Sequence, residues 1–245
     1  MRAALKSEIR KLLTIRSTYI IMILAMLLTG VINGYGSFRA TGALTAHTLA
    51  NDVILPSIAG LSGFVAVVSL LMITHEYRYN TIFYSLTATQ RRTQFLLAKI
   101  LAFSLFAVCF VFIMTIVSVA IACVGHALAG HTIPSQHIDW WNTLWRCVYF
   151  TWGTAALAAL FGVLIRNQVG AIIGYFVGIT SIEGLLSAAI LKHNAIYLPG
   201  MALNNVLQGS AGQGNSPLKG LTISAIWLVG GWLLAWTIFL RRDAN

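Results

Sequence analysis

Acidic side chains are scarce in this sequence, and charged residues of either sign are few. Asp and Glu number 6 and Lys and Arg number 16 among 245 residues, so 9% of the chain is charged, against roughly 25% in globular proteins. With 58% hydrophobic residues and a mean hydropathy of +0.81, this composition excludes an ordinary soluble domain. The three cysteines have no paired spacing, which argues against a disulfide framework.

The net charge of +10 does not indicate a nucleic-acid-binding protein. The basic residues stand beside hydrophobic runs and form no contiguous basic face. If the N-terminus lies inside the cell, the inner segments hold all Lys and Arg except Arg39, Arg146, Lys192 and Lys219. The positive-inside rule therefore predicts that both termini are cytoplasmic.

Six apolar runs follow one another, each long enough to cross a bilayer as a helix. They cover approximately residues 18–35, 54–74, 95–124, 143–165, 169–191 and 221–240. No linker separates two folded units, so residues 1–245 are predicted to form a single polytopic, all-α membrane domain. No small-x-small cleavage site follows the first run, so we expect it to remain in the mature protein.

The segment before the first span is basic and amphipathic. Between Arg2 and Arg16, the residues Leu5, Ile9 and Leu12 recur at helical spacing, with Lys and Arg on the other side. This pattern predicts an interfacial helix at the membrane surface. The alternative is a positively charged flank that only orients the first span.

A polar stretch from Thr74 to Leu101 interrupts the hydrophobic runs on the predicted cytoplasmic side. Glu76, Tyr77 and Arg78 end the second span, and a short segment with apolar residues on one side follows. Such a segment is typical of a helix lying at the membrane surface, with its polar face directed to the cytoplasm. A surface loop would give a similar pattern.

Within this stretch, short motifs occur in a fixed order: Glu76-Tyr77-Arg78, Thr81-Ile82, Ala88-Thr89, Arg91-Arg92 and Ala98-Lys99. The order resembles the first cytoplasmic loop of six-helix ABC exporter permeases, which are made separately from their ATPase. Members often carry a pattern close to E-Y-R-x-G-T-I, then A-T-P-R-R. Asn80 and Gln90 stand here where Gly and Pro are usual, and Asn tolerates turn conformations.

The resemblance implies a permease subunit of an ATP-dependent exporter in a bacterial plasma membrane, working by alternating access. Two such subunits would pair, as a homodimer or with a related permease, above two ATPase subunits that bind the ATP and Mg. This chain would then bind no cofactor and catalyse no bond chemistry. The implied ATPase-docking residues are Glu76, Tyr77, Arg78, Thr81, Ile82, Phe83, Arg91 and Arg92.

The apolar spans favour a hydrophobic or amphipathic cargo, such as a drug, an antibiotic peptide or a lipid. A non-transporting membrane scaffold or sensor subunit and an intramembrane enzyme are the alternative functions. Gly60-Leu61-Ser62-Gly63 matches the pattern of rhomboid-type serine proteases, but no later span holds a His base, which favours simple helix packing. The Gly-rich segment 209–220 lacks the Gly-Lys-Ser/Thr ending of a phosphate loop.

Glu183 is the one acid inside a predicted span. Intramembrane acids usually face a protein interior or an aqueous cavity, so Glu183 is a candidate pathway residue. Alternatively, it is an interfacial carboxylate that pairs with Lys192 or Arg146, or that accepts hydrogen bonds from its neighbours. In the same span, Gly170, Gly174 and Gly178 form a small-residue stripe that admits another helix closely, from this chain or a second copy.

Two outer segments remain open to interpretation. His126, His131, His137 and Asp139 carry metal-binding side chains, but their spacings suit no single helical face, which favours a solvated loop over a metal site. Residues 198–218 combine apolar residues with Pro and Gly. They predict either short re-entrant or lid-like helices or an ordered loop.

Overall fold

The computed structural model describes residues 2–39, 44–79, 92–131, 139–209 and 216–241, which are helical with no strand among them. The elements are α1 (Arg2–Thr14), α2 (Arg16–Arg39), α3 (Ala46–Thr48), η1 (Leu49–Ile54), α4 (Leu55–Arg78), α6 (Arg92–Leu128), α7 (Trp140–Ile165), α8 (Gln168–Tyr175), η2 (Phe176–Ile182), α9 (Glu183–Leu186), η3 (Ser187–Leu191), η4 (Lys192–Tyr197), α10 (Pro199–Gln208) and α11 (Pro217–Arg241).

This part of the chain contains six helical segments that are long and apolar enough to cross a membrane, which confirms the predicted fold class. They run over Arg16–Arg39, Leu49–Arg78, Thr93–Leu128, Trp140–Ile165, Gln168–Leu191 and Pro217–Arg241. Each extends beyond the apolar run that predicted it, because backbone hydrogen bonding continues into polar flanking residues until a capping residue stops it. Asp139 and Asn167 are such caps, accepting hydrogen bonds from the backbone N–H of Asn142 and Gly170.

The helices α4 and α7 form the centre of the bundle and are its most buried spans. They approach closely because small residues face the contact: a Cβ atom at Gly162 would lie 3.3 Å from Ile73. Ala155, Ala156 and Ala159 of α7 are also buried. The outer spans α2, α8 to η3, and α11 pack around this pair and leave large apolar faces exposed, as suits helices in contact with lipid.

The longest helix, α6, has 37 residues and extends roughly 55 Å at the standard rise, more than a bilayer requires. Its first turns support α1, whose Leu12 packs with Val68 of α4 and Ala102 of α6. The helix predicted between Arg2 and Arg16 is therefore present. Its location at a membrane surface stays a prediction.

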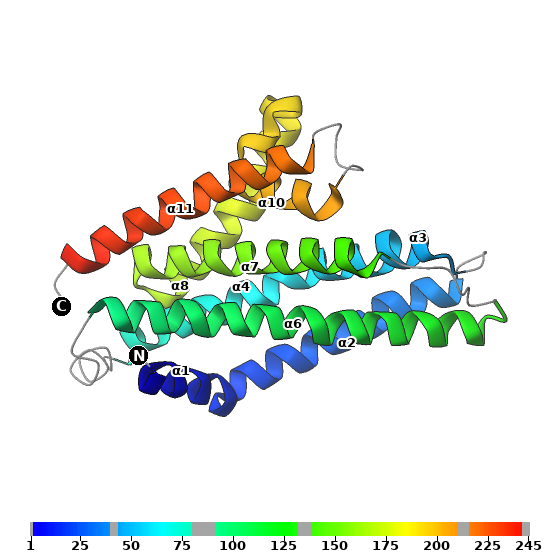
Figure 1. The fold of residues 1–245 in the computed structure, drawn as a ribbon, viewed down its shortest axis with the longest axis horizontal. Helices are drawn as coiled ribbons and strands as arrows, with labels where there is room; N and C mark the ends of the chain where they lie inside the picture. The colour runs from blue at the N-terminus through cyan, green and yellow to red at the C-terminus, as the bar shows by residue number, and fades with distance from the viewer. Residues whose placement is uncertain (1, 40–43, 80–91, 132–138, 210–215, 242–245) are drawn as a thin grey trace.

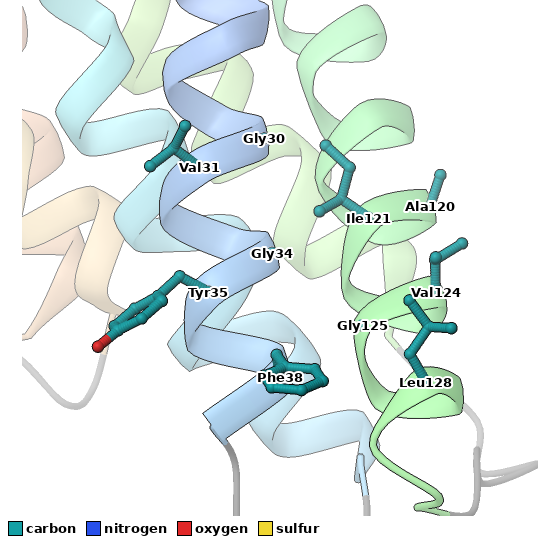
Figure 2. A pocket seen from close by; sticks show the side chains of 10 residues that line it. All are labelled: Gly30, Val31, Gly34, Tyr35, Phe38, Ala120, Ile121, Val124, Gly125 and Leu128. Carbon is teal, nitrogen blue, oxygen red and sulfur yellow. The ribbon is translucent and has the colours of Figure 1, made fainter.

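Near its other end, α6 crosses α2 through small residues. A Cβ atom at Gly125 would lie 2.7 Å from the Cβ of Ser37, so glycine permits this contact. Beside the contact, the two helices enclose an apolar groove of about 670 Å³ (Figure 2). Its lining consists of Gly30, Val31, Gly34, Tyr35, Phe38, Ala120, Ile121, Val124, Gly125 and Leu128.

The fifth span departs from a regular α-helix. After α8 it continues through two π-helical stretches, η2 and η3, on either side of α9, and ends in the 3₁₀ segment η4. π-helical turns are rare and occur frequently at functional sites. Part of the open segment 198–218 is also helical: α10 starts at Pro199 and α11 at Pro217, which suit first helical turns because proline lacks the N–H.

Several elements meet at one end of the molecule, which we call the α1 end (Figure 1). These are the helix α1, the end of α4, the start of α6, the turn between α7 and α8, and the end of α11. The predicted cytoplasmic cations Lys11, Arg78, Lys99, Arg166 and Arg241 belong to these elements or their turn. The predicted docking helix falls within residues 80–91, outside the described residues.

Candidate functional site

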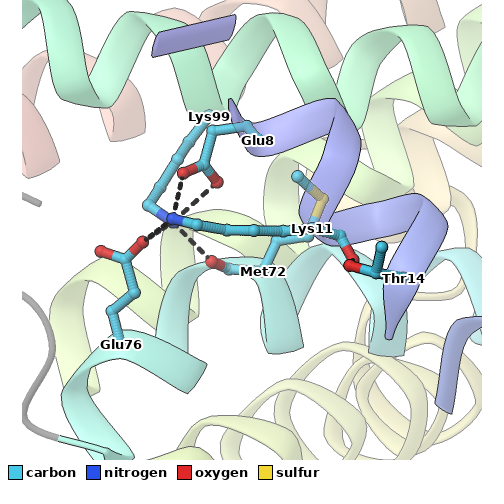
Figure 3. A network of polar contacts seen from close by, with 6 residues as sticks. All are labelled: Glu8, Lys11, Thr14, Met72, Glu76 and Lys99. Carbon is cyan, nitrogen blue, oxygen red and sulfur yellow. Dashed lines mark hydrogen bonds and ion pairs between the residues drawn. The ribbon is translucent and has the colours of Figure 1, made fainter. Parts of the chain in front are cut away.

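A cluster of four charged side chains joins α1, α4 and α6 at the α1 end (Figure 3). The Nζ atom of Lys99 lies 3.1 Å from Oε2 of Glu8 and 3.2 Å from Oε1 of Glu76, and it donates to the carbonyl oxygen of Met72 at 2.8 Å. The Nζ atom of Lys11 lies 2.6 Å from Oε1 of both glutamates. We call Glu8, Lys11, Glu76 and Lys99 the charge cluster.

The charge cluster is electrically balanced, and three of its four members are buried. The relative exposure is 5% for Glu8, 5% for Glu76 and 2% for Lys99, so these charges are removed from water. Buried charges are tolerated when they pair with opposite charges, as these do, although Oε2 of Glu76 accepts no hydrogen bond among the described residues. Lys99 also lies 5.0 Å from the centre of the Phe95 ring, a favourable cation–π position. The geometry fastens α1 to the helices on both sides of segment 79–91.

Electrostatics favour the ionised state of Glu8 and Lys11, the two members of the charge cluster that lie on α1. Burial by itself would raise the pKa of Glu8, but attraction to Lys99 and the hydrogen bond from Lys11 outweigh it and leave this pKa below its ordinary value of 4.5. Burial would lower the pKa of Lys11, but hydrogen bonds to Glu76 and Glu8 raise it above 10.5. Because its pKa is lowered in the folded protein, Glu8 stabilises the fold above pH 4.5, and this contribution is lost as pH falls from 4.5 through the lowered pKa. Because its pKa is raised, Lys11 stabilises the fold below pH 10.5, and this contribution is lost as pH rises from 10.5 through the raised pKa.

Glu76 takes its ion-pair partners from α1 and α6, since it pairs with Lys11 and Lys99 and not with the nearby Arg78. Residues two apart on a helix do not face each other, which separates Glu76 from Arg78. Arg78 instead donates to the side-chain oxygen of Gln168 at 3.1 Å and lies over the Tyr79 ring.

Sequence reasoning missed Glu8 and Lys11 as members of this site. A usable signal was present, because Glu8 is the one acid in the basic N-terminal segment and Lys11 follows it three residues later on a helix. Of the predicted docking residues, Tyr77 packs against the hydrophobic core and lies 5.5 Å below the Arg166 guanidinium. Arg92 begins α6. Thr81, Ile82, Phe83 and Arg91 lie outside the described residues, so the docking role stays a prediction.

Glu183 occupies a second polar site, where α9 meets the start of α10. Its Oε2 atom accepts hydrogen bonds from the backbone N–H of Gly200 at 2.9 Å and of Met201 at 3.2 Å. A carboxylate in this position satisfies free N–H groups in the first turn and interacts favourably with the helix dipole. Of the sequence-based alternatives, hydrogen bonds from nearby backbone are present, whereas the side chain of Lys192 lies outside the part of the chain that the structure describes. Glu183 also borders a cavity of about 290 Å³ between α4, α7, span five and α10.

The glycine stripe of span five lies against α7 of the same chain. A Cβ atom at Gly174 would lie 2.9 Å from Cδ1 of Ile165, and one at Gly170 would lie 3.2 Å from Cγ2 of that residue. Gly178 faces the Phe161 ring with more space, at 3.7 Å. These contacts are possible because the tight turn after Ile165, with Arg166 at φ +58°, returns the chain directly beside α7.

The outer histidines have separate surroundings. His126 is buried, with Nδ1 2.9 Å from the carbonyl oxygen of Ala122, and its ring lies near that of His131. Asp139 caps α7, and His137 lies outside the described residues. Within the described ranges, no group of three or more His, Cys, Asp or Glu side chains is placed to hold a metal ion.

Comparison with known families decides which class of membrane protein this is. The sequence profile described as ABC-2 family transporter protein matches residues 4–185, which is most of the chain. The chain belongs to the ABC-2 transporter family. The resemblance to ABC permeases is thereby confirmed, and this ABC-2 protein is a multi-pass membrane subunit of an ABC transporter. Its matched range includes the charge cluster and Glu183 and ends before α10. No curated protein matches the sequence significantly.

Proposed function

We propose that this ABC-2 permease subunit exports a hydrophobic or amphipathic compound, driven by ATPase subunits that dock on residues 76–94. Two permease subunits pair, as two copies or as one copy with a related permease, and two ATPases bind below them at the cytoplasmic face. ATP and Mg bind to the ATPases. The proposed mechanism is alternating access, in which closure of the ATPases rearranges the spans and moves cargo outward.

The charge cluster is the observation that carries this proposal. Because α4 ends at Arg78 and α6 begins at Arg92, a force applied to residues 79–91 acts on the ends of both helices. The contacts of Lys99 and Lys11 with Glu8 and Glu76 connect that force to α1 as well. A docking segment needs a firm attachment of this kind to transmit movement. An unattached surface loop would dissipate it.

The arrangement of the spans is compatible with cargo passing between spans one, two and five. Spans one and five are mostly exposed in the single chain, whereas span two belongs to the buried α4–α7 centre. Span five also contains the irregular η2 and η3 stretches, where regular α-helical hydrogen bonding is interrupted. Lightly packed spans beside a rigid centre are suited to move relative to it.

The proposal predicts that ATPase association depends on the basic pair in the docking segment. The full chain is coexpressed with ABC ATPases from the same genome, purified through a tag on the permease, and analysed for retained ATPase and ATP turnover. The Arg91→Glu/Arg92→Glu variant should retain at least tenfold less ATPase while inserting normally. Arg39→Glu, on the predicted outer side, serves as the control and should retain as much ATPase as the unmodified chain.

Two results would overturn parts of this proposal. If the unmodified chain retains no ATPase, the assignment as an ATP-driven permease loses its support. If an ATPase is retained equally by both variants, docking does not involve the predicted segment. An ATPase complex that moves no amphipathic dye across vesicle membranes would instead indicate the scaffold or sensor alternative.

A further inference from the structure

The cavity beside Glu183 combines an apolar wall with convergent polar groups. It lies between the α4–α7 centre and the segment formed by span five and α10. Polar side chains line it from six elements, and the remaining lining residues are apolar or glycine. The polar set is Ser62, Thr154, Tyr175, Thr180, Glu183 and Asn204. A small number of polar groups in an otherwise apolar concavity is the usual composition of a small-molecule site.

Glu183 brings a carboxyl group to this cavity, and no cation among the described side chains pairs with it. The residue is 4% exposed, and the ion pairs among the described side chains all belong to the charge cluster at the α1 end. The N–H groups of Gly200 and Met201 offset part of the charge at Oε2. They leave Oε1 without a hydrogen bond among the described residues. A buried carboxylate in this state gains stability from a cation supplied by a ligand.

Gly200 shows that the carboxylate is held in place by the local backbone. A Cβ atom at this position would lie 2.7 Å from Oε2 of Glu183 and 2.9 Å from Cγ2 of Ile179. Glycine therefore lets the start of α10 approach the carboxylate closely enough for two N–H bonds. With Oε2 held by these two bonds, the carboxyl group is oriented before any ligand arrives.

We propose that this cavity binds a small amphipathic amine, with its ammonium group on Glu183 and its hydrocarbon part against the apolar wall. An ammonium group carries up to three N–H donors, which suits one carboxylate oxygen and nearby hydroxyl groups. The volume of about 290 Å³ stands at the small end of known ligand sites, and the apolar wall favours a hydrocarbon-bearing cation over an inorganic one. A role in cargo selection rests on the proposed export function. The binding itself requires no ATPase.

The test measures binding of radiolabelled 2-phenylethylammonium to the purified full chain in phosphatidylcholine nanodiscs, by equilibrium dialysis. The Glu183→Gln variant keeps a carbonyl oxygen for the N–H groups of Gly200 and Met201 but removes the negative charge. We expect at least a tenfold loss of affinity in this variant. For the unmodified chain, 2-phenylethanol, an uncharged compound of similar size, should also bind at least tenfold more weakly than the amine.

Asp139→Asn is the matched control, because it changes another helix-capping carboxylate to an amide at an exposed site away from the cavity. It should bind the amine with unchanged affinity. Ala59→Leu narrows the cavity from α4 without replacing any polar group, and it should weaken binding even if Glu183→Gln does not fold. Equal binding of the amine and the alcohol, or unchanged affinity in a folded Glu183→Gln or Ala59→Leu variant, overturns the site. Because dialysis is done without ATPase, these outcomes are independent of the export assay.

Discussion

At the scale of single residues, Lys99 shows how one buried cation on α6 can hold two other helices together. Its ammonium group reaches Glu8 on α1 and both a carboxylate and a backbone carbonyl on α4. Burial makes each of these contacts matter more than on the surface, because water cannot replace a lost partner. Lys11 contacts the same two carboxylates from a more exposed position, with 41% of its side chain accessible.

This difference in burial predicts unequal effects of removing the two cations. Lys99→Met leaves two buried carboxylates with one cation and should lower the free energy of unfolding by about 3–5 kcal/mol. Lys11→Met removes a half-exposed cation and should cost about 1 kcal/mol or less. Denaturant titration of the purified chain in detergent measures both. The charge-balanced double variant Lys99→Met/Glu76→Gln should lose less than the sum of its single variants, and simple additivity would contradict coupling within the charge cluster.

At the scale of elements, span five and α7 form a hairpin whose tightness depends on glycine. The stripe places Gly170 and Gly174 against Ile165, and an added Cβ atom would have the least room at Gly174 and the most at Gly178. Close helix contact in membranes relies on such small residues, since lipid offers no hydrophobic driving force between helices. After Tyr175 the span enters η2, which keeps its contact with α7 at Gly178 and also contributes Ile179 and Thr180 to the Glu183 cavity.

The spacing predicts different outcomes for the same one-methyl change at two glycines. At Gly178 an added Cβ meets the Phe161 ring at ordinary contact distance, so Gly178→Ala should leave stability unchanged or raise it by up to about 1 kcal/mol through helix propensity. At Gly174 the added atom lies 2.9 Å from Cδ1 of Ile165, so this terminal methyl group must shift, and Gly174→Ala should be less stable than Gly178→Ala by up to about 1 kcal/mol. Thermal melting of the two variants side by side measures the difference, and equal melting temperatures would contradict this packing.

At the scale of the whole molecule, the six spans give the chain two distinct ends. The α1 end carries the charge cluster and the ends of α4 and α11, whereas the opposite end carries α3 and the end of α2 with Arg39 (Figure 1). Since Lys and Arg concentrate on the segments of the α1 end, the positive-inside rule predicts that this end faces the cytoplasm. The Glu183 cavity is lined by α4, α7, span five and α10, and by no residue of α6 or of the charge cluster.

The orientation is tested with single cysteines in a chain whose three native cysteines are replaced by alanine. A cysteine at Thr89 should react with a membrane-impermeant maleimide only in inside-out vesicles, and a cysteine at Gln136 only in intact cells. Labelling of both positions from the same side would contradict the six-span topology.

The sequence by itself determined the class of the protein and its spans. Hydrophobic runs of bilayer length and the distribution of Lys and Arg depend on local composition, so they can be read without knowing any contact. The motifs from Glu76 to Lys99 indicated an ABC permease for the same reason, and the family match bears this out. The helix from Arg2 to Thr14 also followed from its own periodicity.

Only the tertiary structure decided which residues meet. Glu8 and Lys99 are 91 residues apart, and Glu183 accepts hydrogen bonds from N–H groups 17 and 18 residues later, beyond an irregular segment that no helical period describes. The spacing of the glycine stripe does not say whether the helix packed against it belongs to this chain or to a second copy. The structure shows that it is α7 of the same chain, because the left-handed turn at Arg166 brings span five back beside α7. Such pairings depend on how helices cross, and crossing is set by side-chain packing across the whole bundle, which neighbouring sequence does not encode.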